Sequence, residues 1–560
     1  MVKRFFARNR IQKSGRGGVL FYGPGIIDQA VSVPQLVQLR RCYMGPGQMI
    51  EEPGDRVVPY RGLRAQFTPR PARPAFTVMG ARRHTVFMIK LSLLRVLAVG
   101  MVLVAGPVCA ENLPPSLVRL FAREHVPLGG ISIYIQRIHG RQPILEFAAH
   151  TPRDPASVMK LVTSLVGLNT LGPAYTWTTG AYARGAIKNG VLYGNLYVRG
   201  EGDPYLITKS FWDLLHGLRR LGIRRIAGNL VLDQRYLKPP AGSRGVFDGL
   251  RDRTYNVRPQ ALLVNFQAIE FRFLPGPAAI RVIPDPDPTT LAVINHLHLV
   301  GGRCGYWRAH VHLRIERRAQ GNVAVFTGEY PRACGNQHLY RVTDNNRRYL
   351  FGVFQELWRE QGGTFQGRLV MGGRPKGARL LYAVHSRPLA DVLRSINKYS
   401  NNVMGRLLVM TLGAVGEGQP GTNAKGLAVM RAWLVRHDLH LSHFVLRNGV
   451  GLSRSERITA AGVGRVLAYA YNGPYMPEYV SSLPIAGVDG TLRYRFLGTP
   501  VAGHFHGKTG TINGVNTLAG YLQRGLHRYI VVVLENYPEA DTERGFRAED
   551  GVIKWLYARK

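Results

Sequence analysis

The sequence predicts a mixed α/β (α+β) protein in which an antiparallel sheet flanked by helices is divided by a large, mostly-β insertion. Alternating apolar residues at 131–138 and 143–150 indicate a hairpin near the start, and residues 516–537 indicate another antiparallel pair near the end. Residues 255–335 hold mainly short strand patterns separated by Gly and Pro. Similar patterns at both ends, with a foreign block between them, suggest one domain split by an insertion.

The remaining elements follow from local periodicity. A helix is expected after Pro115, and another from Ser157, where Val158, Leu161, Leu165 and Leu168 recur at three- and four-residue steps. Asn189-Gly190 predicts a hairpin turn within 185–200. Further helices are expected at 210–222, 389–399, 401–413, 422–437 and 545–560, and further strands at 226–233 and 380–386.

The first 110 residues differ in texture from the rest. Residues 1–87 are rich in Arg, Gly and Pro without a sustained period, which is typical of a disordered or mis-started extension. Residues 88–110 combine Lys90 and Arg95 with an apolar run at 96–106 and a small-residue end. This predicts a signal peptide, a mature chain from about Glu111 and a periplasmic location. An uncleaved anchor is the alternative, but the apolar run is short for a bilayer span.

The charge of the predicted mature chain bears on its partners. Residues 111–560 hold 57 Lys and Arg against 30 Asp and Glu, a net charge of +27. Such an excess often indicates nucleic acid, which an exported protein rarely meets. We therefore expect no nucleic-acid partner, and anionic wall polymer or a membrane surface instead. Cys304 and Cys334 remain in this part, and in an oxidising compartment they could form one disulfide.

Ser157 and Lys160 are the first candidates for chemistry. They stand three apart, so on a helix the amine can reach the hydroxyl and act as its base. Alone this is a weak signal, because Ser is a common helix N-cap. The same spacing also recurs at Ser395 and Lys398.

Two further motifs strengthen the catalytic interpretation. Ser400-Asn401-Asn402 follows a predicted helix, and Lys508-Thr509-Gly510 precedes the C-terminal hairpin. A Lys and a hydroxyl before a Gly on an edge strand suit the binding of a carboxylate, and Gly lets another backbone approach. The N–H groups of Thr511 and Ser157 could then form an oxyanion hole.

These three motifs, in this order, resemble those of penicillin-binding proteins and class A β-lactamases. The chain resembles in particular the class C low-molecular-mass penicillin-binding proteins, the penicillin-binding protein 4 type D-alanyl-D-alanine carboxypeptidase/endopeptidases. That family carries two extra domains, one nested in the other, between its first two motifs, and here Ser157 and Ser400 lie 243 residues apart. Further matching segments are Gly202-Asp203-Pro204, AGNLVLD, HSRPLADVL, GVGLSR and LPIAGVDGTLRYR.

The resemblance implies a β-lactamase/transpeptidase-like catalytic domain and a role for each motif residue. Ser157 would be the acylated nucleophile, with Lys160 as its base. Ser400 would relay the proton to the leaving group, while Asn402 holds the substrate backbone. Lys508 and Thr509 would bind the terminal carboxylate. Peptidoglycan stem peptides would be the substrate, and β-lactam antibiotics would inhibit covalently.

The resemblance also implies a domain plan. The catalytic domain would comprise 111–184 and 385–560, inserted domain II 185–258 and 323–384, and nested domain III 259–322. An acidic residue of the insert would read the diaminopimelate side chain, with Asp248 and Asp252 as the candidates. Two departures from the family pattern are Asn401, where Asp is common, and Asn448-Gly449-Val450-Gly451 in place of Asp-Gly-Ser-Gly.

Two other functions remain open at this point. A β-lactamase would need a water-activating carboxylate beyond the second motif, for which Glu417 and Glu456 are the candidates, neither in a Glu-x-x-x-Asn setting. A non-catalytic wall-binding scaffold would fit the basic charge and large insert, but not intact motifs. We expect no cofactor, and the histidines show no spacing typical of a metal site.

Overall fold

The computed structural model describes residues 113–242, 247–319 and 321–559. The predicted extension at 1–87 and signal peptide at 88–110 lie outside these residues. Within the described ranges, no helix combines the length and the apolar composition needed to cross a membrane.

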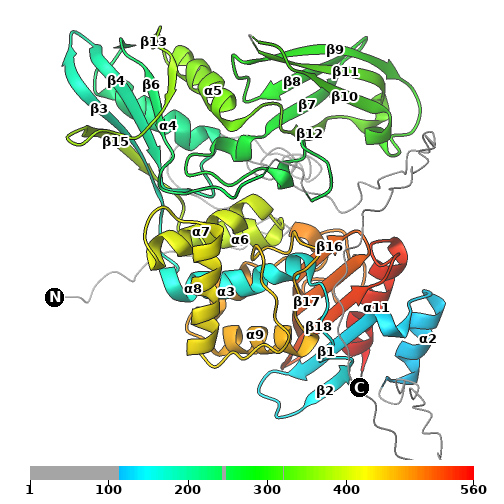
Figure 1. Ribbon diagram of the computed structural model, residues 1–560. Helices are drawn as coiled ribbons and strands as arrows, with labels where there is room; N and C mark the ends of the chain where they lie inside the picture. Colours follow the sequence, from blue (N-terminus) through cyan, green and yellow to red (C-terminus); the bar gives the residue numbers. More distant parts are fainter. Residues whose placement is uncertain (1–112, 243–246, 320, 560) are drawn as a thin grey trace, which may run out of the picture. The chain divides into compact units, whose positions relative to one another are not determined.

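The two ends of the described chain meet in one antiparallel sheet, in the order β16-β17-β18-β1-β2 (Figure 1). Its strands are β1 (Ile131–Arg137), β2 (Pro143–Phe147), β16 (Phe505–Ile512), β17 (Val515–Arg524) and β18 (His527–Asn536). Strands β1 and β18 pair with Ile131 opposite Glu535 and Arg137 opposite Tyr529. Both predicted hairpins therefore form, and they join edge to edge.

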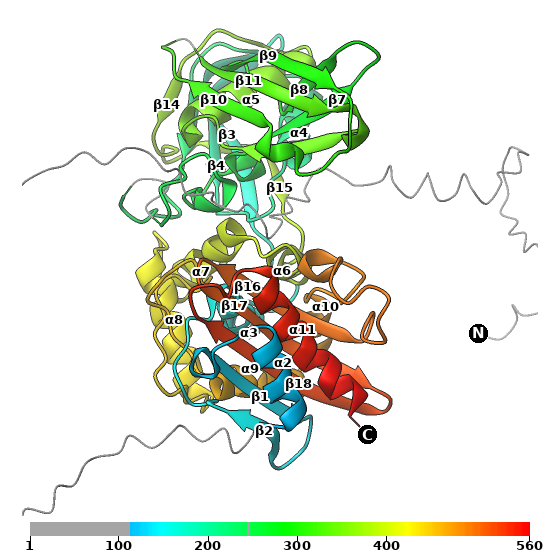
Figure 2. The same cartoon turned by 90° about the vertical axis from the view of Figure 1, so that its right-hand side faces the viewer.

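Helices cover both faces of this sheet. α2 (Pro115–Arg123) and α11 (Glu543–Ala558) lie across one face (Figure 2), and α9 (Ala460–Asn472) contacts β18 and β1. Residues of β18 alternate between the two cores: Val531 and Val533 pack with α2 and α11, whereas Ile530, Val532 and Leu534 pack with α9. A strand buried on both faces reads as an unbroken apolar run, as residues 530–534 do.

The other helices that pack with the split sheet surround α3 (Lys160–Leu171). They are α6 (Leu389–Lys398), α7 (Asn402–Gly416), α8 (Asn423–Arg436) and α10 (Met476–Ser481), and short 3₁₀ turns occur at Ala156–Met159 and Gly490–Leu492. α3 itself is buried along most of its length, which agrees with its nearly all-round apolar sequence.

The insertion has its own sheet and core. Its sheet runs β13-β5-β4-β3-β15, with β6 beside β4 and β14 beside β6. The strands are β3 (Thr178–Lys188), β4 (Val191–Gly200), β5 (Arg225–Ile226), β6 (Leu230–Asp233), β13 (Thr364–Phe365), β14 (Leu369–Met371) and β15 (Arg379–His385). Asn189 and Gly190 both have positive φ, as the predicted hairpin turn requires. Helices α4 (Thr208–Arg220) and α5 (Asn346–Glu360) share its core.

The nested part consists of two small sheets, ordered β12-β7-β8 and β10-β11-β9. Their strands are β7 (Ile269–Pro275), β8 (Ile280–Asp285), β9 (Leu291–Val300), β10 (Val311–Glu316), β11 (Asn322–Pro331) and β12 (Gln337–Arg341). β11 pairs with β9 and β12 with β7, so these pairings extend past the expected end of domain III at 322. The other domain boundaries stay predictions.

A disulfide joins Cys304 and Cys334, whose Cα atoms are 4.6 Å apart. It links the segment before β10 to the 3₁₀ turn after β11.

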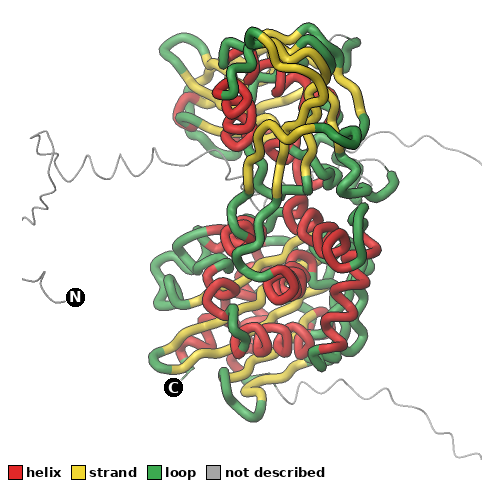
Figure 3. Tube along the Cα trace, turned by 90° about the vertical axis from the view of Figure 1, so that its left-hand side faces the viewer, coloured by secondary structure: helices red, strands yellow, loops and turns green. Residues whose placement is uncertain are grey.

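Helices and strands occur together both around the split sheet and in the insertion (Figure 3), which confirms the predicted mixed α/β class.

Candidate active site

Ser157 lies in the 3₁₀ turn Ala156–Met159, and α3 begins only at Lys160. The α-helix was expected to start at Ser157, but a 3₁₀ turn precedes it. The first residue of that turn, Ala156, has φ +43°. The Ser157 side chain caps neither helical segment. Instead, its Oγ accepts a hydrogen bond from Lys160 Nζ at 2.8 Å. The hydroxyl therefore has an amine within proton-transfer distance.

Lys160 is completely buried. Besides Ser157, its Nζ contacts Asn402 Oδ1 at 2.5 Å and the Val450 carbonyl at 2.8 Å. Each of these three acceptors is uncharged, and together they hold the Lys160 amine beside the Ser157 hydroxyl.

In the second motif, Ser400 and Asn402 contact the two lysines, whereas Asn401 has a structural role. Ser400 has φ +55° and precedes α7, whose first residue, Asn402, contacts Lys160. Asn401 caps α7, because its Oδ1 accepts the Met404 N–H at 3.0 Å. Asn and Asp serve almost equally well as N-caps, so the departure at this position leaves the site intact.

The third motif lies on β16, an edge strand of the split sheet. Lys508 is fully buried and donates to Ser400 Oγ at 2.9 Å and to the Thr509 carbonyl at 2.6 Å. Thr509 Oγ1 donates to Thr491 Oγ1 at 2.7 Å. The three motifs therefore converge as two serine–lysine pairs, Ser157 with Lys160 and Ser400 with Lys508.

Two glycines lie against the backbone of Ser157. A Cβ on Gly510 would come 2.8 Å from the Ser157 nitrogen, and one on Gly451 would come 1.7 Å from the Ala156 carbonyl oxygen. β16 thus reaches the nucleophile turn at the residue before Thr511, as the predicted oxyanion hole requires. The roles of Gly510, Thr511 and the other motif residues stay predictions, to be tested by mutation.

Three contributors to this site escaped the sequence analysis. Asp154 Oδ1 accepts the Ala156 N–H at 3.0 Å and so supports the turn that carries Ser157. The Val450 carbonyl contacts Lys160, and the Thr491 hydroxyl contacts Thr509. The segments GVGLSR and LPIAGVDGTLRYR, which include Val450 and Thr491, were matched as family-like but without a role for either residue.

Asp154 gives the first testable prediction. Burial raises the pKa of its carboxyl to about 6, so the folded chain holds this proton more tightly than an unfolded aspartate does. The free energy of unfolding should therefore fall, through this group, as pH rises from about 4 to about 6. Asp154→Asn keeps an oxygen for the Ala156 N–H and removes the buried charge. We expect the variant to be about 1–3 kcal/mol more stable than the wild type at pH 7.5, and equally stable at pH 4.

Urea unfolding of both proteins at the two pH values checks this prediction. Other buried acids affect both proteins alike, so the difference between them isolates Asp154. A variant that is no more stable at pH 7.5 contradicts it.

The second Ser-x-x-Lys has a structural explanation. Lys398 Nζ forms a 2.6 Å ion pair with Asp489 and also donates to the Leu483 carbonyl. An ammonium paired with a carboxylate is a poor base. Ser395 and Lys398 therefore match the motif in spacing only.

The carboxylates that a β-lactamase would need are not at the site. Glu456 is fully buried, and its Oε1 accepts the N–H groups of Arg447, Asn448 and Gly449. It supports the loop that carries Val450. Glu417 is exposed at the end of α7. Neither geometry is that of a group activating water beside Ser157.

The insert carboxylates are held within their own region. Asp248 accepts hydrogen bonds from Tyr255 and Asn256, and Asp252 lies 3.4 Å from Arg341. In the described ranges, neither forms a hydrogen bond or ion pair with the three motifs. Their proposed reading of the substrate side chain stays a prediction. The described residues also include no cluster of His, Cys, Asp and Glu suited to a metal.

Residues 117–558 match the D-Ala-D-Ala carboxypeptidase 3 (S13) family. The chain belongs to this family. As a member of the S13 carboxypeptidases it is a serine-type hydrolase of the penicillin-binding class, which confirms the resemblance drawn from the three motifs.

Curated relatives of this S13 carboxypeptidase span most of its length. It is 26% identical over 422 residues to the D-alanyl-D-alanine carboxypeptidase DacB of Haemophilus influenzae, covering 74% of this chain and 87% of that one. It is 28% identical over 382 residues to the D-alanyl-D-alanine carboxypeptidase of an Actinomadura species, covering 66% and 70%.

A solved structure shares the fold. The crystal structure of penicillin binding protein 4 from Haemophilus influenzae matches with a TM-score of 0.65 at 22% identity, covering 79% of this S13 carboxypeptidase and 99% of that chain. The same protein complexed with a β-lactam matches with a TM-score of 0.62. This likeness confirms the transpeptidase-like fold with its β-rich insertion.

Proposed function

We propose that this S13 carboxypeptidase is exported to the periplasm, where it cleaves D-Ala-D-Ala termini and D-Ala–diaminopimelate cross-links of peptidoglycan through an acyl-enzyme on Ser157. The observation that carries the proposal is the pair of serine–lysine contacts, Ser157 with Lys160 and Ser400 with Lys508. Family membership supports the reaction class, and the pattern at 88–110 supports export.

Acylation begins with a proton transfer. Neutral Lys160 takes the Ser157 hydroxyl proton, and Oγ attacks the penultimate D-Ala carbonyl carbon. The oxyanion that forms accepts hydrogen bonds from the N–H groups of Ser157 and Thr511. When the C–N bond breaks, Ser400 relays the proton held by Lys160 to the departing amine, so that Lys160 is neutral again, and Lys508 helps hold the substrate carboxylate.

Deacylation repeats these steps with water as the nucleophile. Lys160 accepts the water proton, the ester bond to Ser157 breaks, and the proton returns to Oγ. A carboxypeptidase reaction releases free D-Ala, whereas an endopeptidase reaction releases an amine still attached to another stem peptide. A β-lactam would acylate Ser157 in the same way, as the β-lactam complex of the Haemophilus influenzae relative suggests.

Labelling with fluorescent penicillin tests the nucleophile. We expect a stable covalent adduct that mass spectrometry maps to the peptide containing Ser157, and no adduct with Ser157→Ala. Ser395→Ala is the matched control, because it removes the serine of the other Ser-x-x-Lys, and it should label like the wild type. An adduct elsewhere, or none on a folded wild type, contradicts the proposal; rapid turnover of a chromogenic β-lactam would favour a β-lactamase.

Two further assays separate the parts of the proposal. A pentapeptide ending in D-Ala-D-Ala and a cross-linked muropeptide dimer report carboxypeptidase and endopeptidase activity independently. Cell fractionation followed by N-terminal sequencing reports export, with Glu111 as the expected first residue. Cytoplasmic recovery of an unprocessed chain would refute export without affecting the catalytic proposal.

A further inference from the structure

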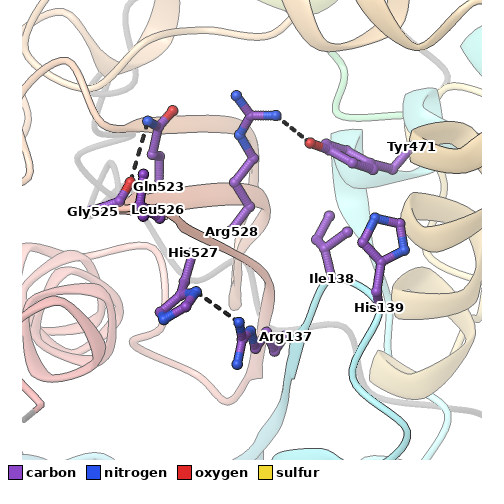
Figure 4. Close-up of a pocket in the computed structure, with 9 residues that line it drawn as sticks. All are labelled: Arg137, Ile138, His139, Tyr471, Gln523, Gly525, Leu526, His527 and Arg528. Atoms are coloured by element: carbon purple, nitrogen blue, oxygen red, sulfur yellow. Dashed lines mark hydrogen bonds between the residues drawn. The ribbon is translucent and has the colours of Figure 1, made fainter.

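A cationic cavity lies at the far end of the split sheet, away from the motifs. It has a volume of about 410 Å³ and is bounded by the end of β1, the β17–β18 turn and the end of α9 (Figure 4). The side chains that matter here are Arg137, His139, Tyr471, Leu526, His527 and Arg528. Arg137, His139, His527 and Arg528 are exposed, so the cavity is a shallow surface site.

The cavity offers hydrogen-bond donors and positive charge without a neutralising acid. No carboxylate lines it, and in the described part of the chain neither Arg137 nor Arg528 forms an ion pair with one. Arg137 donates to His527 Nδ1 at 2.8 Å, which fixes a hydrogen on Nε2 of that ring. Arg528 donates to the Tyr471 hydroxyl (Figure 4). The remaining guanidinium N–H groups suit a phosphate oxygen.

An apolar side chain next to these cations is fully exposed to solvent. Leu526, at the tip of the turn between β17 and β18, is 100% exposed. A single exposed leucine is ordinary by itself. Its position among Arg137, His527 and Arg528 is the arrangement used by proteins that lie on membranes, where cations meet headgroups and an apolar residue enters the acyl boundary.

We infer that this hairpin-tip site, made of Arg137, His139, Leu526, His527 and Arg528, binds the phosphate of an anionic phospholipid at a membrane surface, with Leu526 inserted. The inference goes beyond the proposed function and does not depend on it. The net charge of +27 over residues 111–560 adds long-range attraction to an anionic surface.

Binding at this site leaves the catalytic residues free. Lys508 pairs with Ala519 on β17, and six further residues lead to Gly525 at the turn. At about 3.3 Å per residue, the tip lies roughly 20 Å along the sheet from Lys508. A protein held to a membrane by this tip could therefore still receive wall peptides at Ser157.

Vesicle co-sedimentation with the full chain tests the inference. The vesicles are phosphatidylcholine alone, or phosphatidylcholine with roughly one-third phosphatidylglycerol. Arg137→Gln with Arg528→Gln should weaken binding to the anionic vesicles at least about tenfold. Leu526→Ser should weaken it several-fold. The wild type and all variants share residues 1–112, so a difference in vesicle binding between them is due to the substituted site.

The matched controls make the same kinds of substitution at exposed positions away from the hairpin-tip site. Arg119→Gln with Arg184→Gln removes the same charge from two exposed positions, and Leu221→Ser removes another exposed leucine. Neither control should change vesicle binding, and penicillin labelling should be equal in all variants. Anionic vesicle binding that is unchanged by the hairpin-tip substitutions overturns the inference.

Leu526 distinguishes a lipid from a soluble anion. Calorimetry with inorganic phosphate should detect at most weak binding, equal in wild type and Leu526→Ser. Arginine-dependent vesicle binding that is unchanged by Leu526→Ser overturns the insertion of Leu526. Phosphate binding as strong as vesicle binding overturns the lipid and indicates a soluble anion as the ligand.

Discussion

Replacing Lys160 with methionine is expected to abolish penicillin acylation and D-Ala release while leaving the protein folded. Methionine fills a similar volume in a fully buried position but cannot accept the Ser157 proton. General-base catalysis alone contributes about 10²–10⁴-fold, so the second-order acylation rate should fall by at least about 10²-fold. Stopped-flow measurement with a fluorescent penicillin gives this rate directly.

Lys160→Arg separates proton transfer from charge. Arginine keeps a cation near Asn402 and Val450 but stays protonated at all accessible pH values. It should acylate as poorly as the methionine variant. An arginine variant with near wild-type acylation would show that Lys160 acts as a cation, and would contradict its role as the base. A thermal melt of each variant verifies that it is folded.

Gly451→Ala is expected to have the largest effect of any change outside the three motifs. Gly451 has φ +80°, and a Cβ there would lie 1.7 Å from the Ala156 carbonyl oxygen and 2.7 Å from the Ser157 nitrogen. The nucleophile turn must therefore move, and the neighbouring Val450 carbonyl moves away from Lys160 with it. We expect acylation to fall by about 10²-fold or more, because small displacements of reacting groups carry that cost.

Gly222→Ala is the matched control for backbone strain. Gly222 has φ +83°, but a Cβ there would meet nothing within 4 Å. Both variants should lose about 1–3 kcal/mol of stability from the positive φ, and Gly451→Ala should lose more through the clash. Only Gly451→Ala should lose acylation. Normal acylation by a folded Gly451→Ala protein would contradict the close packing of this loop against Ser157.

The three motifs were predictable because each is local in sequence and each residue type has its own chemistry. The structure places Ser157 and Asn402 within hydrogen-bond distance of Lys160, and Ser400 within hydrogen-bond distance of Lys508. Their order and the long interval before Ser400 were enough to indicate the family. The split sheet was predictable for a similar reason, since each of its strands is a local run of strand-forming residues and its hairpins close over short turns.

Other features depend on contacts between distant segments and leave no local signal. Ser395 and Lys398 have the same spacing as Ser157 and Lys160, and only the ion pair with Asp489 tells the two apart. The Val450 carbonyl is a backbone group that any residue could supply. The parallel pairing of β9 with β11 likewise depends on a crossover whose register the strand patterns do not encode.

The pairing of β1 with β18 has a consequence for how the enzyme is made. Residues 131–137 can pair with β2 early, but their pairing with β18 has to wait until residues 529–535 have been synthesised. The sheet is therefore completed only near the end of translation. Ser157 and Lys160 are present early, but Lys508 and β16 arrive some 350 residues later. A growing chain therefore holds a nucleophile without its substrate-binding strand. Because the third motif is synthesised so late, we expect no hydrolase activity until nearly the whole chain has been made.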